Sequence, residues 1–469
     1  MSPQDRLGPP PAHGAASITA RLDRLPATRT VWRLVVLLSI GGCFELYDLL
    51  MTAYVSPGLI RAGIFQGGSK GFLGLSDQAA FASITFAGLF VATIGLGHIA
   101  DRFGRRVIFT WSLLWYSAAT LVMASRSTAV GVDLWRFIAA LGIGVELVTI
   151  DTYIAELVPK RMRGRAFTVN QAIQFCSVPL AALLGWIFVP IAPFGIDGWR
   201  FVAAFPALAA IVVWTIRRAV PESPRWLAQQ GRSAEADRIA TSIEARVAAE
   251  SGLRLPPPDP APAEEAGGGT LRDIWVPPYR RRTIMLIVFN LCQTVGYYGF
   301  NNWVPALMAA QGASFTHSLK YSFIVALASP TVPLLFYKLA DRSERKWQLV
   351  GAACGIAVFG GLFTLSTAPA WLILCGIALT TANNLLSYSF HAYQPELFPT
   401  RVRARAVGFV YSFSRLSTIF SSFAIAYFLA QFGAPGVFGF IGLAMLGVVV
   451  SIGAFGPRTR GLALEQISR

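Results

Sequence analysis

Five ionisable residues of the first half of the chain stand inside long apolar runs: Glu45, Asp48, Arg136, Glu146 and Asp151. Placing such a side chain in a bilayer costs several kcal/mol, so intramembrane charges usually mark a pathway for ions or substrate. Glu45 and Asp48 are three residues apart and therefore share one helix face. The residue types indicate proton movement or the binding of a charged solute.

The apolar runs of the second half contain a different set, with Arg415 and His391 among amides. At about 1.5 Å per residue, Asp48 and Glu146 lie ~20 Å from their basic flank and Arg415 and His391 ~15 Å. Gln293 lies at the same depth as Arg415, so one cavity is expected to contact all five. The same estimate places Arg136 nearer to the other membrane surface than Asp48.

Each of these residues has a simpler structural interpretation. In that interpretation, the four acids have a purely structural role as hydrogen-bond partners between helices. Arg415 can bind a carboxylate through its planar fork, or it can form an internal pair with an acid such as Glu45. His391 can relay protons or bind substrate, or it can be a satisfied polar contact. Asn383 and Asn384 are candidate binding amides or interhelical contacts.

The elements that must position these side chains are transmembrane helices. Of 469 residues, 54% are apolar and 14% charged, which is more apolar surface than a soluble globule can hide. The runs lack the alternation of barrel strands, so the spans must be helices. We expect an all-α membrane protein with twelve helices in two six-helix bundles, spanning near 33–57, 79–100, 107–125, 130–157, 166–190, 199–216, 283–308, 318–340, 347–367, 370–396, 406–431 and 435–455.

The polar segments divide the chain further. We expect a disordered tail over 1–30, an N-terminal bundle over 31–218, a cytoplasmic linker over 219–280, a C-terminal bundle over 281–456 and a tail over 457–469. Within the linker, Ser233–Ala249 is typical of a capped amphipathic helix and Pro256–Gly269 of a flexible connection.

The net charge of +16 indicates orientation rather than a nucleic-acid partner. If the N-terminus is cytoplasmic, 33 of the 40 Lys and Arg residues fall in cytoplasmic segments, which predicts that both termini are cytoplasmic. The five cysteines all lie in apolar segments without paired spacing, which argues against disulfides or a zinc site. We expect no metal and no cofactor.

Two charged stretches recur at an offset of 240 residues. Residues 101–106 and 156–166 reappear as 341–346 and 396–406, and every acid, proline and basic position of the first copy is matched except Lys160, where the second copy has Thr400. Such an internal repeat is typical of secondary transporters.

The stretch Gly97-His98-Ile99-Ala100-Asp101-Arg102-Phe103-Gly104-Arg105-Arg106 closely resembles the loop between helices two and three of the major facilitator superfamily. Three further stretches resemble its sugar porter branch and the organic-ion relatives: Arg136 with Gly142 and Gly144, residues 221–227 (PESPRWL) and residues 457–465. The resemblance implies a conformational gate formed by Gly97, Asp101, Arg102, Gly104, Arg105, Arg106, Glu156, Arg163, Glu222, Arg225, Asp341, Arg342, Glu396 and Arg403. In the second copy, Tyr337 replaces the leading glycine, so that loop is expected to latch less tightly.

The resemblance also assigns roles inside the membrane. Asp48 matches the helix-one acid that sugar porters use for proton coupling, paired there with a helix-four arginine, here Arg136. We therefore predict proton coupling by Asp48 with Arg136, supported by Glu45, Glu146 and Asp151. Arg415 resembles the helix-eleven arginine of organic anion carriers.

Helix seven departs from the sugar porters. Their paired glutamines are represented by Gln293 alone, and the following Tyr297, Tyr298, Asn301 and Asn302 are more similar to carriers of aromatic or other organic ions. The predicted substrate-binding residues are Arg415, Gln293, Tyr297, Tyr298, Asn301, Asn302, His391, Asn383 and Asn384.

We predict a proton-coupled symporter of a small organic or aromatic carboxylate, working by alternating access as a monomer in a bacterial inner membrane. A sugar or polyol symporter and a carrier of organic cations are the alternatives within this class. A nutrient sensor would need a signalling domain, which the cytoplasmic segments lack. A membrane enzyme would need convergent catalytic groups, which four scattered histidines do not supply.

Overall fold

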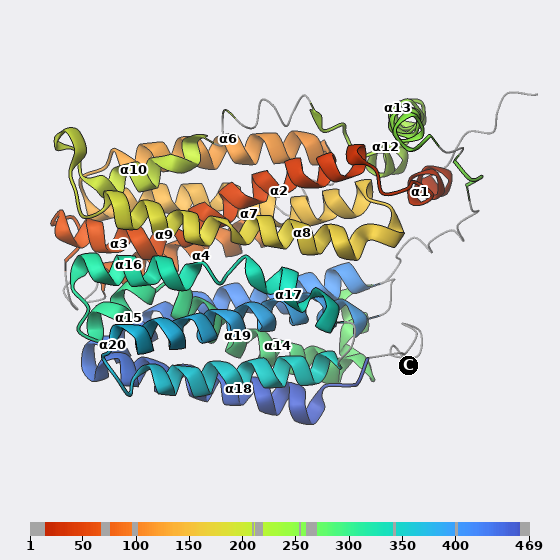
Figure 1. Ribbon diagram of the computed structural model, residues 1–469. Coiled ribbons are helices and arrows are strands. Elements are labelled where there is room, and N and C mark those ends of the chain that lie inside the picture. The colour runs from red at the N-terminus through yellow and green to blue at the C-terminus, as the bar shows by residue number, and fades with distance from the viewer. Residues whose placement is uncertain are drawn as a thin grey trace, which may run out of the picture.

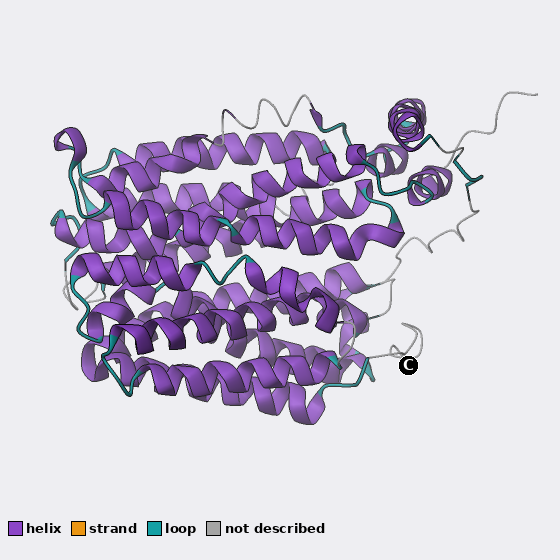
Figure 2. Ribbon diagram, viewed as in Figure 1, coloured by secondary structure: helices purple, strands orange, loops and turns teal. Residues whose placement is uncertain are grey.

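Long helices form two bundles that lie side by side in the computed structural model (Figure 1), with loops joining them (Figure 2). The structure describes residues 15–66, 76–95, 102–208, 211, 219–252, 255–258, 270–340, 344–398 and 402–459. Within these residues nine helices are long and apolar enough to cross a membrane. One of the nine runs through a turn, as described below.

The N-terminal bundle contains the first six spans. Its helices are α2 (Arg29–Leu50), α3 (Thr52–Arg61), α4 (Asp77–Gly95), α6 (Arg105–Ala124), α7 (Ala129–Leu157), α8 (Arg163–Phe175), α9 (Ser177–Phe188) and α10 (Gly198–Ala204). Two pairs, α2 with α3 and α8 with α9, each form one span with a break. Short 3-10 turns, η3 (Lys160–Met162), η4 (Pro193–Gly195) and η5 (Phe205–Leu208), lie between spans.

The C-terminal bundle repeats this arrangement. Its helices are α14 (Tyr279–Asn301), α15 (Val304–Ala310), α16 (Phe315–Ala326), α17 (Thr331–Ala340), α18 (Arg345–Phe363), α19 (Pro369–Glu396) and α20 (Arg403–Phe455). Pro330 lies between α16 and α17, where it removes a backbone donor and interrupts the helix. Gly433 has a left-handed backbone with φ of 63° and divides α20 into two antiparallel spans. Twelve predicted spans are therefore consistent with this architecture.

Small residues allow the helices of the N-terminal bundle to approach closely. A Cβ on Gly144 of α7 would lie 2.6 Å from Ala92 of α4, and one on Gly88 of α4 would lie 2.6 Å from Ala140. Such small-residue contacts are a common way for membrane helices to pack. The α4–α7 contact therefore fixes the position of α7, the helix that carries Arg136, Glu146 and Asp151.

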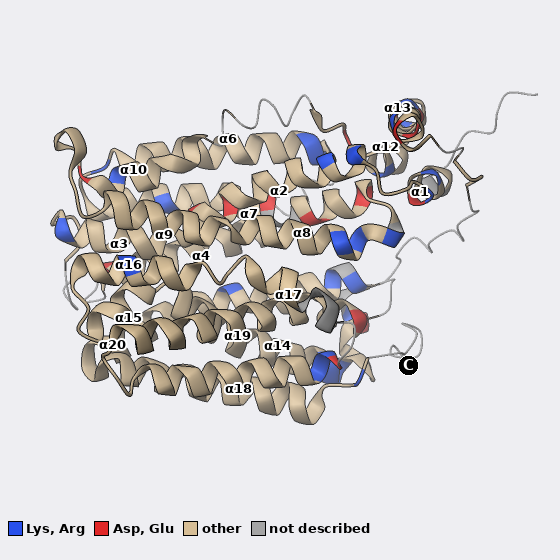
Figure 3. Cartoon of the chain, viewed as in Figure 1, with Lys and Arg blue, Asp and Glu red and all other residues tan. Residues whose placement is uncertain are grey.

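Three short helices lie at one end of the bundle, which we call the α13 end (Figure 1). They are α1 (Ala15–Asp23), α12 (Pro224–Gln229) and α13 (Ser233–Ser251). Most of the blue Lys and Arg residues in Figure 3 also lie at this end. A further 3-10 turn, η6 (Leu271–Trp275), precedes α14.

Two expectations for these polar segments are wrong. Residues 15–23 of the predicted disordered tail form α1, because Ile18 and Leu22 are buried and Arg21 bonds to Glu244 and Asp237 of α13. Residues 1–14 lie outside the described residues. The helix over 233–251 is present, but it begins without a side-chain cap; Ser223 instead caps α12 by accepting from the Trp226 N–H.

The contact of α1 with α13 predicts a pH dependence. Burial alone would raise the pKa of Glu244, but hydrogen bonds from Arg21 and Arg24 outweigh it, so this pKa lies below its ordinary value. A lowered carboxyl pKa stabilises the folded contact above the unfolded pKa of about 4.3 and loses that effect as pH falls through the folded value. Hydrogen exchange at residues 15–23 should therefore accelerate below about pH 4.3 relative to the adjacent α2.

Glu244→Gln should give the fast exchange already at neutral pH, because the charge is absent. Glu235→Gln, which removes an exposed partner of Arg232 on the same helix, serves as the control. Equal protection of residues 15–23 in all three proteins would contradict the role of Glu244.

Candidate functional site

Asp48 and Arg136 form a fully buried ion pair between α2 and α7. Arg136 Nη1 lies 2.8 Å from Asp48 Oδ2, and both side chains have 0% exposure. The depth difference estimated from the sequence is thus closed by the length of the arginine side chain. Among the ion pairs in which both partners are described residues, this pair is the only fully buried one.

Threonines and backbone satisfy the rest of this pair. Arg136 Nη2 donates to the Asp48 carbonyl at 2.6 Å and its Nε donates to Thr85 at 2.9 Å. Thr120 donates to Asp48 Oδ1 at 3.1 Å. The pair is held by donors and acceptors from α2, α4, α6 and α7, so its charge state affects the whole N-terminal bundle. The threonines carried no signal in the sequence, because threonine is common in membrane helices.

Three further acids lie near this pair. Glu45 is close enough to interact with the charges of Asp151, Arg415 and Asp48, and Glu146 with that of Glu45. Glu45 and Glu146 are buried, whereas Asp151 is exposed and accepts from Asn170 at 3.4 Å. The structure therefore brings the predicted proton-coupling residues close together on α2 and α7, and Figure 3 shows red acidic bands on helices of this bundle.

Arg415 lies on α20 of the other bundle and faces these acids. Its side chain is 4% exposed. Nη1 donates to the Tyr298 hydroxyl at 3.1 Å and Nη2 to the Tyr411 hydroxyl at 3.2 Å, with the guanidinium 4.8 Å from the Tyr411 ring centre. Within the described residues no carboxylate lies within 4 Å of it. The internal pair with Glu45 left open by the sequence is not formed.

Aromatic side chains surround the guanidinium. Tyr298 contacts Phe86 of the N-terminal bundle with ring centres 4.5 Å apart, and Tyr297 at 5.0 Å. His391 stacks on Phe390 at 4.1 Å and meets Tyr411 edge-on at 5.8 Å. Tyr411 was not among the predicted site residues, although its position four before Arg415 places the two on one helix face.

The predicted amides are more dispersed. Asn301 donates to the Tyr297 carbonyl at 2.9 Å and Asn384 to the Ser329 carbonyl at 3.3 Å, so these amides bond within the C-terminal bundle. Asn383, Asn302 and Gln293 are buried, and Asn383 has both amide atoms without a partner. An interhelical bond that the sequence did not indicate joins Asn290 to Gln394 at 2.9 Å.

Solvent reaches the interface from one side. Asp151 and His391 are both exposed, and they lie close enough to interact with Tyr411 and Arg415, respectively. Both residues precede the α13 end of their helices by only about two turns. At the opposite end the bundles touch: Arg61 lies over Phe315, Lys320 lies over Trp186, and Trp186 stacks on Phe323 at 5.8 Å.

The first gate lies at the α13 end. Glu222 Oε1 accepts the backbone N–H groups of Arg105 and Arg106 at 3.0 and 3.1 Å, so its carboxylate binds the N-terminus of α6. Burial raises the pKa of Glu222, although these N–H groups and that of Ser223 oppose the shift. Arg105 Nη2 also pairs with Glu156 at 3.1 Å.

Further gate residues tie α1 to the bundle. Asp23 Oδ1 accepts from Arg225 at 2.8 Å and from Arg163 at 3.3 Å. Arg102 lies over the Phe103 ring and is exposed. The predicted gate residues Gly97, Asp101, Asp341 and Arg342 lie outside the described residues.

The second gate repeats the first. Arg345 pairs with Glu396 as Arg105 pairs with Glu156. Arg163 and Arg403 each donate to the carbonyl five residues earlier, at 3.3 and 3.2 Å. Tyr153 and Tyr393 are also 240 residues apart, and each donates to the carbonyl of a proline that follows the last span of its bundle, Pro221 and Pro457, respectively. The 240-residue repeat in the sequence is therefore accompanied by repeated contacts in the structure.

Known proteins resemble the chain over nearly its whole length. The family model described as "Sugar (and other) transporter" matches residues 34–469. The putative metabolite transport protein YyaJ of Bacillus subtilis is 29% identical over 95% of this chain and 97% of its own. The niacin transporter NiaP of Acinetobacter baylyi is 28% identical over 96% of this chain and 99% of its own.

Two solved structures share the fold. The xylose transporter XylE of Escherichia coli, in a partially occluded inward open conformation, has a TM-score of 0.73 at 19% identity over 92% of this chain and 99% of that one. A D-xylose-proton symporter has a TM-score of 0.68 at 18% identity over 92% and 99%.

The first gate predicts a strict requirement for Gly104. Its backbone, with φ of 99° and ψ of 155°, lies in a region that only glycine adopts readily, and an added Cβ would lie 2.6 Å from Glu222 Oε2. Gly104→Ala should lower the free energy of unfolding by about 1–3 kcal/mol, measured by thermal or denaturant unfolding of the purified protein.

Gly164→Ala is the matched control, because Gly164 is helical and has open space around its Cβ position. That variant should be neutral or slightly stabilising, since alanine favours a helix by up to about 1 kcal/mol over glycine. Equal stability of the two variants would show that the Glu222 contact does not constrain the turn.

Proposed function

The chain belongs to the family of sugar and other transporters, and from this premise we propose that it is a proton-coupled symporter of a small organic or aromatic carboxylate. Its matched relatives are membrane transporters rather than enzymes. Transport requires a central binding site that each side of the membrane reaches in turn. The choice of substrate rests on Arg415.

Arg415 is a buried cation whose hydrogen-bond partners are neutral. A guanidinium has five N–H donors, and the two tyrosine hydroxyls occupy only part of them. An uncompensated buried charge is expensive, so a bound carboxylate would relieve this cost while forming two parallel hydrogen bonds. This observation carries the proposal.

The surroundings favour a flat substrate. Tyr298, Tyr411 and His391 offer ring faces and edges around the guanidinium, which suits stacking on an aromatic ring. One relative is named as a niacin transporter, and niacin is an aromatic carboxylate. Both facts support an aromatic acid among the substrates.

Asp48 is the proposed proton carrier. Its carboxylate forms an ion pair with Arg136 and accepts a hydrogen bond from Thr120. Protonation of Asp48 would remove its negative charge and so release the arginine. One structure with the same fold is titled a D-xylose-proton symporter, which supports coupling to protons in this fold. Glu45, Glu146 and Asp151 would then accept or pass the proton between Asp48 and the Arg415 side.

The structure is best explained as a state open toward the α13 end. Asp151 and His391 are exposed near that end, whereas the contacts of Arg61, Lys320 and Trp186 join the bundles at the opposite end.

We propose that the α13 end, with both termini, is cytoplasmic, because it carries most of the basic residues. The membrane would be the bacterial plasma membrane, and the transporting unit a monomer. The proposed division is a linker over 219–280 between bundles 31–218 and 281–456.

A sugar or polyol is the second candidate. It is favoured by the buried amides of Gln293, Asn302 and Asn383, because Asn302 and Asn383 have polar atoms without partners that could bond hydroxyl groups. Such a substrate would leave the charge of Arg415 uncompensated, which is why we place it second.

Arg415→Gln should remove carboxylate binding. Losing a charge-assisted contact of about 1.5–3 kcal/mol lowers affinity by roughly 10- to 100-fold. The test is a thermal-shift screen of purified protein with aromatic and aliphatic carboxylates, sugars and amines, followed by uptake in proteoliposomes. Arg33→Gln, at an exposed arginine outside the site, is the control.

Carboxylate uptake that survives in Arg415→Gln would reject the proposed substrate class. Because this variant removes a buried charge, its own melting temperature is measured first. Arg415→Lys, which keeps the charge but not the planar fork, should recover uptake only in part.

Asp48→Asn should uncouple transport from protons. The amide keeps the size and an acceptor for Arg136 but cannot titrate, so accumulation driven by a pH gradient should be abolished while substrate exchange without a gradient continues. Asp197→Asn, at a half-exposed position between η4 and α10, should leave both activities unchanged. Accumulation at the wild-type level in Asp48→Asn would assign proton coupling to another residue.

A further inference from the structure

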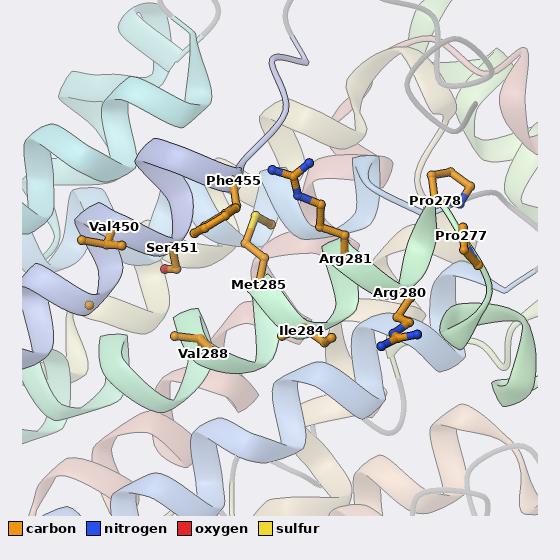
Figure 4. A pocket seen from close by; sticks show the side chains of 11 residues that line it. Pro277, Pro278, Arg280, Arg281, Ile284, Met285, Val288, Val450, Ser451 and Phe455 are labelled. Atoms are coloured by element: carbon orange, nitrogen blue, oxygen red, sulfur yellow. The ribbon is translucent and has the colours of Figure 1, made fainter.

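A cavity of about 710 Å³ lies between α14 and the last span of α20, outside the site described above (Figure 4). Its lining includes two arginines at the start of α14 and apolar side chains from both helices. We call it the α14–α20 groove. Its residues are Pro277, Pro278, Arg280, Arg281, Ile284, Met285, Val288, Gly447, Val450, Ser451 and Phe455.

The groove opens on the lipid-facing surface of the C-terminal bundle. Ile284 is 45% exposed, and Val450 and Phe455 are each 50% exposed, although all three belong to transmembrane helices. Met285 and Ser451 are buried and form the floor. Apolar side chains exposed on a membrane helix face acyl chains, so the occupant of the groove is expected to be apolar over this length.

The end of the groove is strongly basic. Arg280 and Arg281 are exposed, and neither side chain forms an ion pair or hydrogen bond within the described part of the chain. Arg281 instead lies over the Phe455 ring at 5.3 Å. The next residue differs, because Arg282 donates to the Leu397 carbonyl at 3.1 Å and so belongs to the bundle. Of the three consecutive arginines, only Arg282 therefore uses its guanidinium for a hydrogen bond within the described residues.

The spacing along α14 matches one leaflet of a bilayer. From Arg281 to Val288 the helix rises by about 10 Å, within the ~15 Å of hydrocarbon that one leaflet contributes. Trp275 of η6 is 44% exposed just before the helix, where interfacial tryptophans anchor membrane proteins. The arginines therefore stand at the level of lipid headgroups and the apolar side chains at the level of acyl chains.

We propose that the α14–α20 groove binds an anionic glycerophospholipid of the leaflet at the α13 end. Its phosphate would bind at the end of the groove that carries Arg280 and Arg281, because a guanidinium can donate paired hydrogen bonds to phosphate. One acyl chain would follow Ile284, Val288 and Val450. Basic pockets between transmembrane helices bind such headgroups in other membrane proteins. The site is independent of the transported substrate.

The test uses the full-length protein purified in detergent, with phosphatidylglycerol and phosphatidylcholine of identical acyl chains. Native mass spectrometry counts retained lipids and thermal unfolding measures stabilisation. The wild type should retain at least one phosphatidylglycerol and be stabilised by it more than by phosphatidylcholine. The double variant Arg280→Gln with Arg281→Gln should bind phosphatidylglycerol at least tenfold more weakly.

The control is Arg33→Gln with Arg246→Gln, which removes the same charge from two exposed arginines that line neither cavity described for the chain. It should retain the lipid as the wild type does. Equal losses in the two double variants would reduce the effect to net charge and overturn the proposal.

A second variant addresses the acyl chain. Ile284→Trp fills the groove without changing charge, and it should also weaken phosphatidylglycerol binding while leaving the melting temperature of the lipid-free protein near that of the wild type. Glycerol phosphate serves as a headgroup without chains. If glycerol phosphate stabilises the wild type as well as phosphatidylglycerol does, or if Ile284→Trp binds lipid normally, the groove is an anion site and not a lipid site.

Discussion

The cost of burying charge away from water governs this structure. Inside a bilayer a guanidinium or carboxylate must find partners in the protein, and the two intramembrane arginines meet this requirement differently. Arg136 is satisfied by Asp48, Thr85 and backbone, whereas the hydrogen-bond partners of Arg415 within the described residues are two neutral tyrosine hydroxyls. One arginine therefore holds its bundle together, and the other is the residue on which the proposed carboxylate substrate depends.

The repeated gates show how the same constraint is met at the membrane surface. In each bundle an arginine pairs with a glutamate 51 residues later, another arginine binds a carbonyl five residues before it, and a tyrosine binds the carbonyl of a proline after the last span. Each interaction joins helices of one bundle, so it keeps that bundle rigid while the interface between bundles changes. Rocking of two rigid halves is the motion that alternating access needs.

Much of this arrangement could be predicted from the sequence, and the exceptions have identifiable causes. Spans follow from the length of apolar runs, and the pairing of Asp48 with Arg136 follows from resemblance, because both depend on patterns along the chain. The contacts of Tyr153 and Tyr393 could not be predicted, since a tyrosine in an apolar run has many available carbonyls. The helix α1 was missed because Arg21 finds its partners more than 200 residues away. The groove at Arg280 was also missed, because a basic helix start predicts orientation and not a cavity.

The position of Glu45 connects the two charged centres. It lies one helical turn from Asp48 on α2, and it is close enough to interact with Arg415 of the other bundle. The proposed carboxylate substrate at Arg415 would bring a negative charge close to Glu45, so bound substrate would interact electrostatically with this acid cluster. Conversely, protonation of Asp48 would free Arg136 and change the electrostatic environment of Glu45 on the same helix. Substrate and proton would thus be linked through the charge of α2, without a chain of moving side chains between the bundles.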